Sequence, residues 1–378
     1  MWIISYNVER NPGSFVPSND LLWEIVMILN KKIVAFATVA ALVLSAVSAY
    51  NPPVGAEDMC LLSSPKTLTG SVTSAGGALL SAGPDSIVVN PALTAKEQRV
   101  SLNVGYTFLF SPDDYLNESN TGCALQTGIL IPVSMFVFSG YTNYTSARFG
   151  DMYLGRSINA KAGLAKEITS KLSVGLSVSG GYTWLYGTDW ALGGNIGAMY
   201  DFGNLLFLED VRLGASVLNI GKNYKDVLRL PIHLNKEMSA YPSLLTFKAG
   251  AAGTVLKNDV LELGMAIDFT TPLFQNLIVD FNTELEIKKM FVVSVAERFN
   301  VRESFNGYTN FIPTVGVFFR FTFGVKDNAY LESNGWSQSE MTVSAAYRNL
   351  YGTVHAMSAG ADLNLGMKDT EAPEINVW

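Results

Sequence analysis

The sequence is poor in the residues that build most catalytic and metal sites. It has two cysteines, Cys60 and Cys123, and two histidines, His233 and His355, among 378 residues. Two cysteines are too few for a disulfide scaffold, although these two could either pair in an oxidising compartment or stay free. No spacing of histidines, cysteines and carboxylates is typical of a metal site, and no serine has a neighbouring histidine to activate it. We therefore expect no enzyme, no metal site and no cofactor.

Charge is scarce as well, at 16% of the residues, and the net charge is −7. This balance argues against nucleic acid as a partner, because proteins that bind it carry clustered positive charge. No glycine-rich loop follows a strand and opens a helix, so nucleotide binding has no basis. Apolar residues, in contrast, make up 48% of the chain, and the mean hydropathy of +0.22 is high for a soluble protein. Even so, no apolar run after the first fifty residues is long enough for a spanning helix.

The apolar residues alternate with polar ones. In residues 277–288, Leu277, Val279 and Phe281 occupy one face of a strand, whereas Asp280 and Asn282 occupy the other. The same period of two recurs along two thirds of the chain, in segments of about ten to thirteen residues. An apolar outer skin and a hydrated or plugged lumen would explain it. The sequence predicts an all-β transmembrane antiparallel β-barrel.

Fourteen strands are predicted, an even number as expected for a closed bacterial barrel. Pro132 separates two apolar runs, so the second and third strands are the least regular of the set. The predicted strands are 99–110, 124–133, 134–144, 156–169, 172–185, 190–202, 208–221, 243–256, 260–272, 276–288, 290–303, 312–323, 338–350 and 353–365.

Fourteen strands would leave both ends of the barrel on the periplasmic side, so connections after even strands should be short and those after odd strands longer and external. Two connections disagree with this rule, because 324–337 is long where a short turn is expected and 186–189 is short where a loop is expected. The longer external connections are expected at 111–123, 145–155, 222–242 and 304–311.

Residues 1–49 are predicted to be a signal peptide. Lys31 and Lys32 precede an apolar run at 33–44, and small residues lead to a cleavage position after Ala49. A membrane-anchor helix is the alternative, but the apolar run is shorter than the roughly 20 residues that span a bilayer. Translation from Met27 would give a leader of ordinary length. The signal peptide predicts export, and with the barrel it predicts the cell outer membrane.

The remaining domains follow from where alternation starts and stops. Residues 50–98 do not alternate and are expected to form a small N-terminal hatch, or plug, before a barrel at 99–367. A short helix is predicted within 71–81, ended by Gly83-Pro84. Asn90 is expected to cap, and Pro91 to begin, another short helix. Residues 368–378 form a C-terminal tail that resembles a linker.

The stretch from Ser74 to Leu93, with its Asn90-Pro91-Ala92 element, followed at once by the first strand, resembles the FadL-type outer-membrane transporters of long-chain fatty acids. The resemblance is greatest to the spirochaete members of that family. It implies a fourteen-stranded barrel with Asn90, Pro91 and Ala92 in the hatch. It also implies that a substrate binds first in an apolar groove among external loops and then in a pocket near the hatch.

The counterpart of that groove is expected in residues 222–242. An apolar stripe there would suit an acyl chain, and an adjacent cation would suit a carboxylate. The alternative is a loop that folds onto the barrel rim and buries its leucines for stability. The short 186–189 connection departs from the family, which has a second long loop there. The expected groove residues are Leu228, Leu230, Ile232, Leu234, Met238 and Lys236.

Charged residues in the inward phase of the strands form a second candidate site. They could make an ion-conducting constriction. The alternative is a network of ion pairs that braces the wall against the hatch. The residues expected in this network are Glu262, Asp268, Asp280, Glu284, Arg298, Arg320 and Arg348.

These patterns predict an outer-membrane transport protein that passes long-chain fatty acids or similar hydrophobic small molecules through a plugged β-barrel. A structural or adhesin barrel without transport is an alternative, and a general porin is another. The expected partners are the hydrophobic small molecules themselves, outer-membrane lipid and the barrel-assembly machinery.

Overall fold

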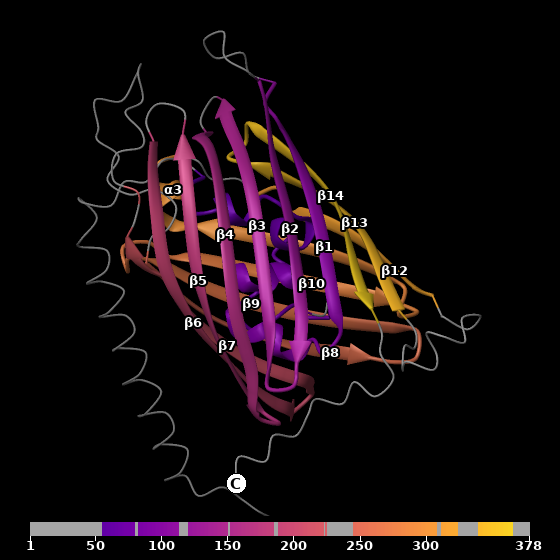
Figure 1. Ribbon diagram of the computed structural model, residues 1–378. Helices are drawn as coiled ribbons and strands as arrows, with labels where there is room; N and C mark the ends of the chain where they lie inside the picture. Colours follow the sequence, from indigo (N-terminus) through magenta and orange to yellow (C-terminus); the bar gives the residue numbers. More distant parts are fainter. Residues whose placement is uncertain are drawn as a thin grey trace, which may run out of the picture. The chain divides into compact units, whose positions relative to one another are not determined.

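Fourteen antiparallel strands close into one barrel in the computed structural model (Figure 1). The structure describes residues 55–79, 82–112, 120–149, 152–184, 188–222, 224, 245–307, 311–323 and 339–365. The predicted signal peptide and C-terminal tail therefore lie outside the described residues. The strands are β1 (Val100–Phe110), β2 (Thr121–Val133), β3 (Phe136–Phe149), β4 (Met152–Thr169), β5 (Leu172–Trp184), β6 (Thr188–Leu205), β7 (Leu208–Lys222), β8 (Thr246–Lys257), β9 (Leu261–Pro272), β10 (Ile278–Ile287), β11 (Phe291–Asn300), β12 (Thr314–Phe323), β13 (Ser339–Leu350) and β14 (Val354–Leu365).

Each strand pairs with its neighbours in sequence, and β1 closes the barrel against β14, with Val100 opposite Leu365. All fourteen predicted strands are confirmed, including β2 and β3 around Pro132. One predicted loop is wrong: β3 and β4 run through most of 145–155, and only residues 150–151 separate them. Thr145 and Ala147 are buried on the inner face, so the alternation continues there in small residues that an apolar pattern does not reveal.

The two ends of the barrel differ in their connections. At the end where β1 begins and β14 ends, here called the turn end, five hairpins turn within two or three residues. In the β10–β11 turn, Lys288 and Lys289 both have positive φ, as the tight hairpin turns require. At the opposite end, here called the loop end, the long connections follow β1, β7 and β11, whereas 185–187 is short as predicted. The connection 324–338 lies outside the described residues.

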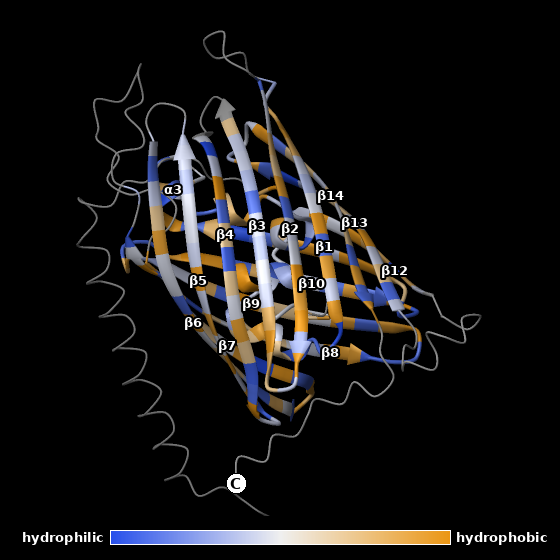
Figure 2. Cartoon of the chain, viewed as in Figure 1, coloured by the Kyte–Doolittle hydropathy of each residue, from blue (hydrophilic) through white to orange (hydrophobic). Residues whose placement is uncertain are grey.

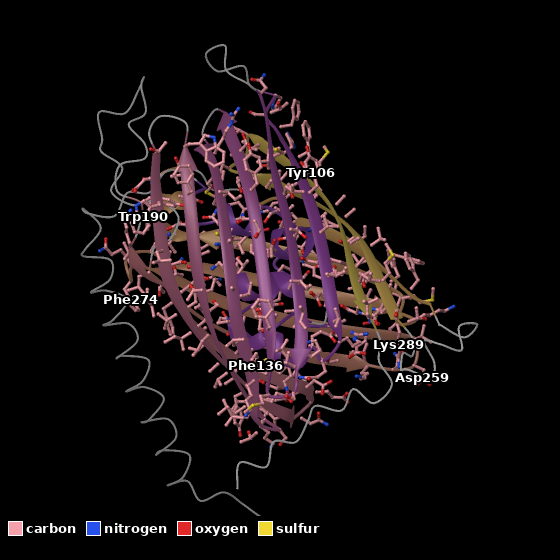
Figure 3. All side chains as sticks on the ribbon, in the orientation of Figure 1. Tyr106, Phe136, Trp190, Asp259, Phe274 and Lys289 are labelled. Carbon is pink, nitrogen blue, oxygen red and sulfur yellow. The ribbon has the colours of Figure 1, made fainter. Side chains whose placement is uncertain are left out.

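The outer face of the wall is apolar. On β5, Leu176 and Val178 are 60% and 61% exposed, whereas Ser173 and Ser177 face inward and are buried. On β10, Phe281 points outward and Glu284 is fully buried in the lumen. Orange residues recur along the strands between blue and white ones in Figure 2, and Figure 3 places Phe136, Asp259 and Lys289 at the turn end. A closed barrel with this outer skin is suited to a bilayer, where every backbone polar group needs a partner within the wall.

Residues 55–79 and 82–98, called the hatch, fill the lumen with short helical turns. These are η1 (Met59–Leu61), α2 (Pro65–Leu68), η2 (Pro84–Val88) and η3 (Pro91–Lys96). Their contacts are with the inner wall: α2 lies against β12 to β14, η2 against β1 to β4, and η3 against β3 to β6. A further short helix, α3 (Val301–Phe305), lies in the β11–β12 connection. Within the described residues, no helix has both the length and the apolar character needed to cross a membrane.

The helix predicted in 71–81 is wrong for its described part, because residues 71–79 form turns and bends. The hydroxyl of Thr73 donates to the carbonyl oxygen of Gly76 at 2.6 Å, and Gly76 has a φ of +88°. Local bonds of this kind compete with a helix. Pro84 starts η2 rather than ending a preceding helix. The predictions for Asn90 and Pro91 are confirmed, since Asn90 caps η3 and Pro91 is its first residue.

Candidate functional site

The hatch backbone touches the wall where the wall carries glycine. A Cβ on Gly214 of β7 would lie 1.7 Å from the carbonyl oxygen of Ser74, and one on Gly197 of β6 would lie 1.9 Å from Oδ1 of Asn90. No side chain fits into such gaps, so glycine is what allows the hatch to seat directly on the wall. The middle of the lumen is therefore closed along these strands.

Asn90 ties three parts of the structure together. Its Oδ1 accepts a hydrogen bond from the backbone N–H of Ala92 at 3.0 Å, which caps η3. Its Nδ2 donates to the carbonyl oxygens of Ser74 at 2.7 Å and of Ala198 on β6 at 3.0 Å. The side chain is fully buried. The sequence places Asn90, Pro91 and Ala92 in the hatch, and they lie inside the barrel against β5 and β6.

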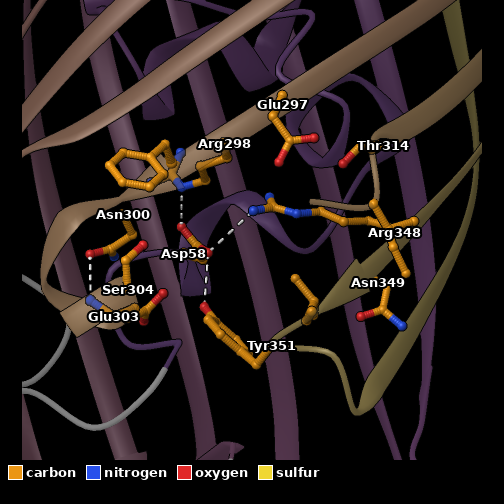
Figure 4. Close-up of a pocket in the computed structure, with 13 residues that line it drawn as sticks. Asp58, Glu297, Arg298, Asn300, Glu303, Ser304, Thr314, Arg348, Asn349 and Tyr351 are labelled. Atoms are coloured by element: carbon orange, nitrogen blue, oxygen red, sulfur yellow. Dashed lines mark hydrogen bonds and ion pairs between the residues drawn. The ribbon is translucent and has the colours of Figure 1, made fainter. Parts of the chain in front are cut away.

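A buried ion pair holds the hatch at the loop end (Figure 4). Asp58 lies 2.7 Å from Nε of Arg298 and 3.6 Å from Nη2 of Arg348, and it accepts a hydrogen bond from the hydroxyl of Tyr351 at 2.9 Å. Arg298 also contacts Asp280 of the wall at 2.8 Å. Burial acts to raise the pKa of Asp58, but Arg298, Arg348 and Tyr351 outweigh burial and lower that pKa below its ordinary value. Asp58 therefore stays ionised inside the barrel.

A second carboxyl group at the loop end, that of Glu303, is protonated where Asp58 is ionised. Glu303 of α3 accepts a hydrogen bond from the backbone N–H of Gly55 at 3.3 Å. Burial raises the pKa of Glu303 to about 8, and the nearby carboxylates of Asp58 and Glu57 contribute to the rise. At neutral pH this side chain is mostly protonated.

Wall carboxylates also bind the hatch backbone. Asp268 of β9 accepts from the N–H of Ser74 at 3.0 Å and pairs with Lys248 at 3.2 Å. Glu284 of β10 accepts from the N–H of Leu79 at 2.6 Å. Thus Asp268, Glu284, Arg298 and Arg348 of the expected network contact the hatch. These contacts favour a network that braces wall against hatch over an ion-conducting constriction.

Three residues of the expected network contact the wall instead. Asp280 pairs with Arg298 as described above. Glu262 pairs with Lys257 at 3.1 Å. Arg320 lies between Glu286 at 3.3 Å and Glu340 at 3.4 Å.

Asp58, Lys161 and Arg212 are functional candidates that the sequence analysis missed. The inward strand phase of Lys161 and Arg212 could have revealed those two. Asp58 had no such signal, because the hatch does not alternate. Lys161 of β4 is only 7% exposed and has no carboxylate within 4 Å among the described residues. It faces a cavity of about 70 Å³ that is lined by apolar residues such as Leu61, Val88 and Leu218 and also by the charged residues Glu57, Lys248 and Arg298. A buried ammonium with no carboxylate within ion-pair distance is suited to an anionic ligand group.

The predicted groove residues Leu228, Leu230, Ile232, Leu234, Met238 and Lys236 lie outside the described residues, so the groove stays a prediction. From the start of that loop, Tyr224 is described. It is 3% exposed, and its hydroxyl lies 3.4 Å from Oδ1 of Asn159. Tyr224, at the start of this connection, therefore lies inside the mouth of the barrel.

Two further features bear on chemistry. Cys60 and Cys123 are both free, so the disulfide alternative is not realised. Burial raises the pKa of the Cys60 thiol. No group of three or more metal-ligating side chains occurs in the part of the chain that the structure describes.

The interior cavities lined by described residues differ in size. Those beside Asp58 and between the hatch and β9–β12 have volumes of about 40 and 20 Å³, and that beside Lys161 has about 70 Å³. Such volumes hold only a few water molecules. A larger cavity of about 320 Å³ lies at the turn end between the hatch and β6 to β9.

No family model matches the chain, and no curated protein resembles it in sequence. Solved structures do resemble it. The CymD monoaromatic hydrocarbon channel matches with a TM-score of 0.51 and 10% identity, covering 83% of this chain and all (100%) of that one. The Ralstonia pickettii toluene transporter TbuX matches with a TM-score of 0.44 and 12% identity, covering 79% of this chain and 97% of that one.

A Pseudomonas aeruginosa FadL homologue matches with a TM-score of 0.41 and 11% identity, covering 79% of this chain and 96% of that one. At these identities the likeness shows the fold alone, and CymD is the comparison on which it rests. The fold implied by the resemblance of the sequence to FadL-type transporters is confirmed.

Proposed function

We propose that this protein is an outer-membrane channel for the passive transport of hydrophobic small molecules, with long-chain fatty acids as cargo. In this proposal the signal peptide exports the chain, the loop end faces outward and the turn end faces the periplasm. External loops capture the molecule, the lumen beside the hatch receives it, and it leaves on the periplasmic side.

Lys161 is the observation that carries the proposal of a fatty acid. Its ammonium is buried and has no carboxylate within 4 Å among the described residues, in a cavity that Lys248, Arg298 and Glu57 also line. It therefore offers a charge-assisted contact for a ligand carboxylate. The acyl chain would extend among Leu61, Val88 and Leu218. The hatch would have to shift for this, since the cavity of about 70 Å³ admits only the head of such a molecule.

A general porin is disfavoured by the closed lumen. Glycine-mediated contacts seat the hatch on the wall, and the cavities beside it at the loop end are too small for a hydrated sugar. The adhesin alternative predicts no bound ligand. Mass spectrometry of lipid that co-purifies with the detergent-extracted protein distinguishes it from a transporter.

The decisive experiment measures the affinity of purified protein for oleate and for the uncharged oleyl alcohol. Lys161→Met should weaken oleate binding about 10-fold to 100-fold, because one hydrogen bond to a charged group contributes about 1.5–3 kcal/mol. It should leave oleyl alcohol binding unchanged. Lys171→Met, at an exposed turn position, is the matched control. Equal oleate affinity in the Lys161→Met variant and the parent would refute the role of Lys161.

A further inference from the structure

The largest of the four cavities described above lies far from Lys161, at the turn end of the barrel. We call it the turn-end chamber. Its volume of about 320 Å³ exceeds that of the cavities at the loop end several times over. Ala78, Leu79, Ala82 and Leu93 of the hatch and Met199 of β6 form its apolar lining. A cavity of about 150 Å³ lined by apolar side chains holds benzene, so this one has room for a substantially larger hydrocarbon.

The wall itself builds the chamber. On three strands, an inward glycine that touches the hatch is followed, two residues closer to the turn end, by a large side chain that lines the chamber. Gly197, Gly214 and Gly264 bring the wall against the hatch. The next inward side chains, Met199, Arg212 and Glu262, line the space between wall and hatch. The hatch and the wall are thus in contact at the three glycines. The space between them widens two residues closer to the turn end.

The strand pairing is also irregular around the chamber. Register shifts occur between Asp201 and Leu205 on β6, between Glu209 and Arg212 on β7, and between Thr254 and Leu256 on β8. Asp210 has a φ of +51°. Bulges bend and twist a strand locally, and they gather where a wall is reshaped. Three neighbouring strand pairs share this feature at the same end of the barrel.

The charged side chains around the chamber already have hydrogen-bond or ion-pair partners. This favours an uncharged ligand over a charged one. The guanidinium of Arg212 donates to the carbonyl oxygens of Gly77 and Ala78 at 2.8 and 3.0 Å. A charged ligand would have to displace one of these partners, whereas an uncharged hydrocarbon would not. The ion pairs are Lys96–Glu167, Lys96–Asp201, Glu97–Arg99, Lys257–Glu262 and Lys257–Asp210, at 2.8 to 3.8 Å.

The hatch side of the chamber is held by two wall side chains. Arg212 binds residues 77 and 78 through their carbonyl oxygens, and Glu284 of β10 binds the N–H of Leu79. Gly76, just before this stretch, lies in the left-handed region with a φ of +88°, which glycine adopts without the strain that a side chain would add. Release of the hydrogen bonds from Arg212 and Glu284 to residues 77–79 would open the chamber toward the narrower part of the lumen on the loop-end side.

We infer that the turn-end chamber is the exit site of the transport route. It binds the uncharged hydrocarbon part of the cargo, and residues 76–79, latched by Arg212, separate it from the lumen. This inference rests on the proposed function, because it gives the cargo its last binding site before the periplasm.

The test blocks the chamber after the protein has folded. Ala82→Cys is introduced in a Cys60→Ser/Cys123→Ser background and expressed in a Gram-negative host that lacks fatty-acid uptake of its own. Methanethiosulfonate ethylsulfonate, which reaches the periplasm through the host's porins, then places a sulfonate in the chamber. Uptake of radiolabelled oleate should fall at least 10-fold and recover with dithiothreitol. Leu206→Cys, in the 93% exposed turn between β6 and β7, is the matched control and should keep its rate.

Oleate binding to the purified, labelled protein separates this inference from the proposed function. We expect its affinity to stay within twofold of the unlabelled protein, because capture takes place at the loop end. An unchanged uptake rate after full labelling of the Ala82→Cys variant would overturn the exit site and leave the transporter intact. Absence of both uptake and binding in the unlabelled parent would overturn both proposals.

A second variant examines the latch without filling the chamber. Arg212→Met keeps an unbranched side chain of similar length and removes the donors to Gly77 and Ala78. We expect oleate uptake to rise severalfold because residues 76–79 are released more often. An uptake rate equal to that of the parent would overturn the latch.

Discussion

Valine in place of Gly197 should displace the hatch from its contact with the barrel wall at β6. A Cβ at this position would lie 1.9 Å from Oδ1 of Asn90 and 2.9 Å from Cδ of Pro91. Asn90 cannot move aside without losing its bonds to Ala92, Ser74 and Ala198. Three hydrogen bonds at about 1 kcal/mol each amount to about 3 kcal/mol. The balance between a seated and a displaced hatch should therefore shift about 100-fold.

The displaced hatch should open the lumen to small polar solutes, which liposome swelling in arabinose measures directly. Vesicles with the parent protein should swell slowly, and those with the Gly197→Val variant several times faster. Gly194→Val is the matched control, because Gly194 lies on the same strand in the outward phase and a Cβ there would meet only the carbonyl oxygen of Ile220 at 3.9 Å. If the Gly197→Val barrel stays as tight as the parent while its hatch resists protease equally well, the seating argument is wrong.

Two further predictions concern pH and the membrane face. Because the pKa of Glu303 is raised to about 8 by burial and by Asp58 and Glu57, the folded state holds a proton that the unfolded state releases above about pH 4.5. Stability should therefore fall as pH rises from about 4.5 to 8. Glu303→Gln should flatten this dependence in gel-shift melting curves, and an equally steep fall in the variant would contradict the assignment. Val178→Arg should destabilise the folded barrel in vesicles by about 2–4 kcal/mol if Val178 lies near the bilayer centre, whereas Leu206→Arg in the exposed turn should cost little. Equal urea midpoints for these two variants would show that Val178 does not face lipid.

The strands could be predicted because lipid-facing and lumen-facing residues alternate within each strand. Val178 and Phe281 alternate with Ser177 and Glu284 since lipid and lumen impose opposite demands on neighbouring residues. The missed extension of β3 and β4 follows the same logic. Small side chains such as Ala147 satisfy both environments and leave no apolar signal.

The hatch was predictable only where its chemistry is local. The cap of Asn90 on η3 involves residues two positions apart, and it follows from the Asn-Pro pair. The conformation of residues 71–79 did not follow, because their N–H and C=O groups find partners on the wall. The N–H of Ser74 bonds Asp268, and that of Leu79 bonds Glu284. A helix prediction assumes that these partners lie within the segment itself.

By itself the sequence predicted the number of strands, the direction that the side chains of its alternating segments face and the presence of a non-alternating segment ahead of the barrel. Period-two alternation encodes all three locally. Only the tertiary structure decided which charges meet, such as Asp58 with Arg298, and which have no carboxylate within 4 Å among the described residues, such as Lys161. Those outcomes depend on the position of the hatch in the closed lumen. Contacts between residues so far apart in the chain produce no periodic pattern in the sequence.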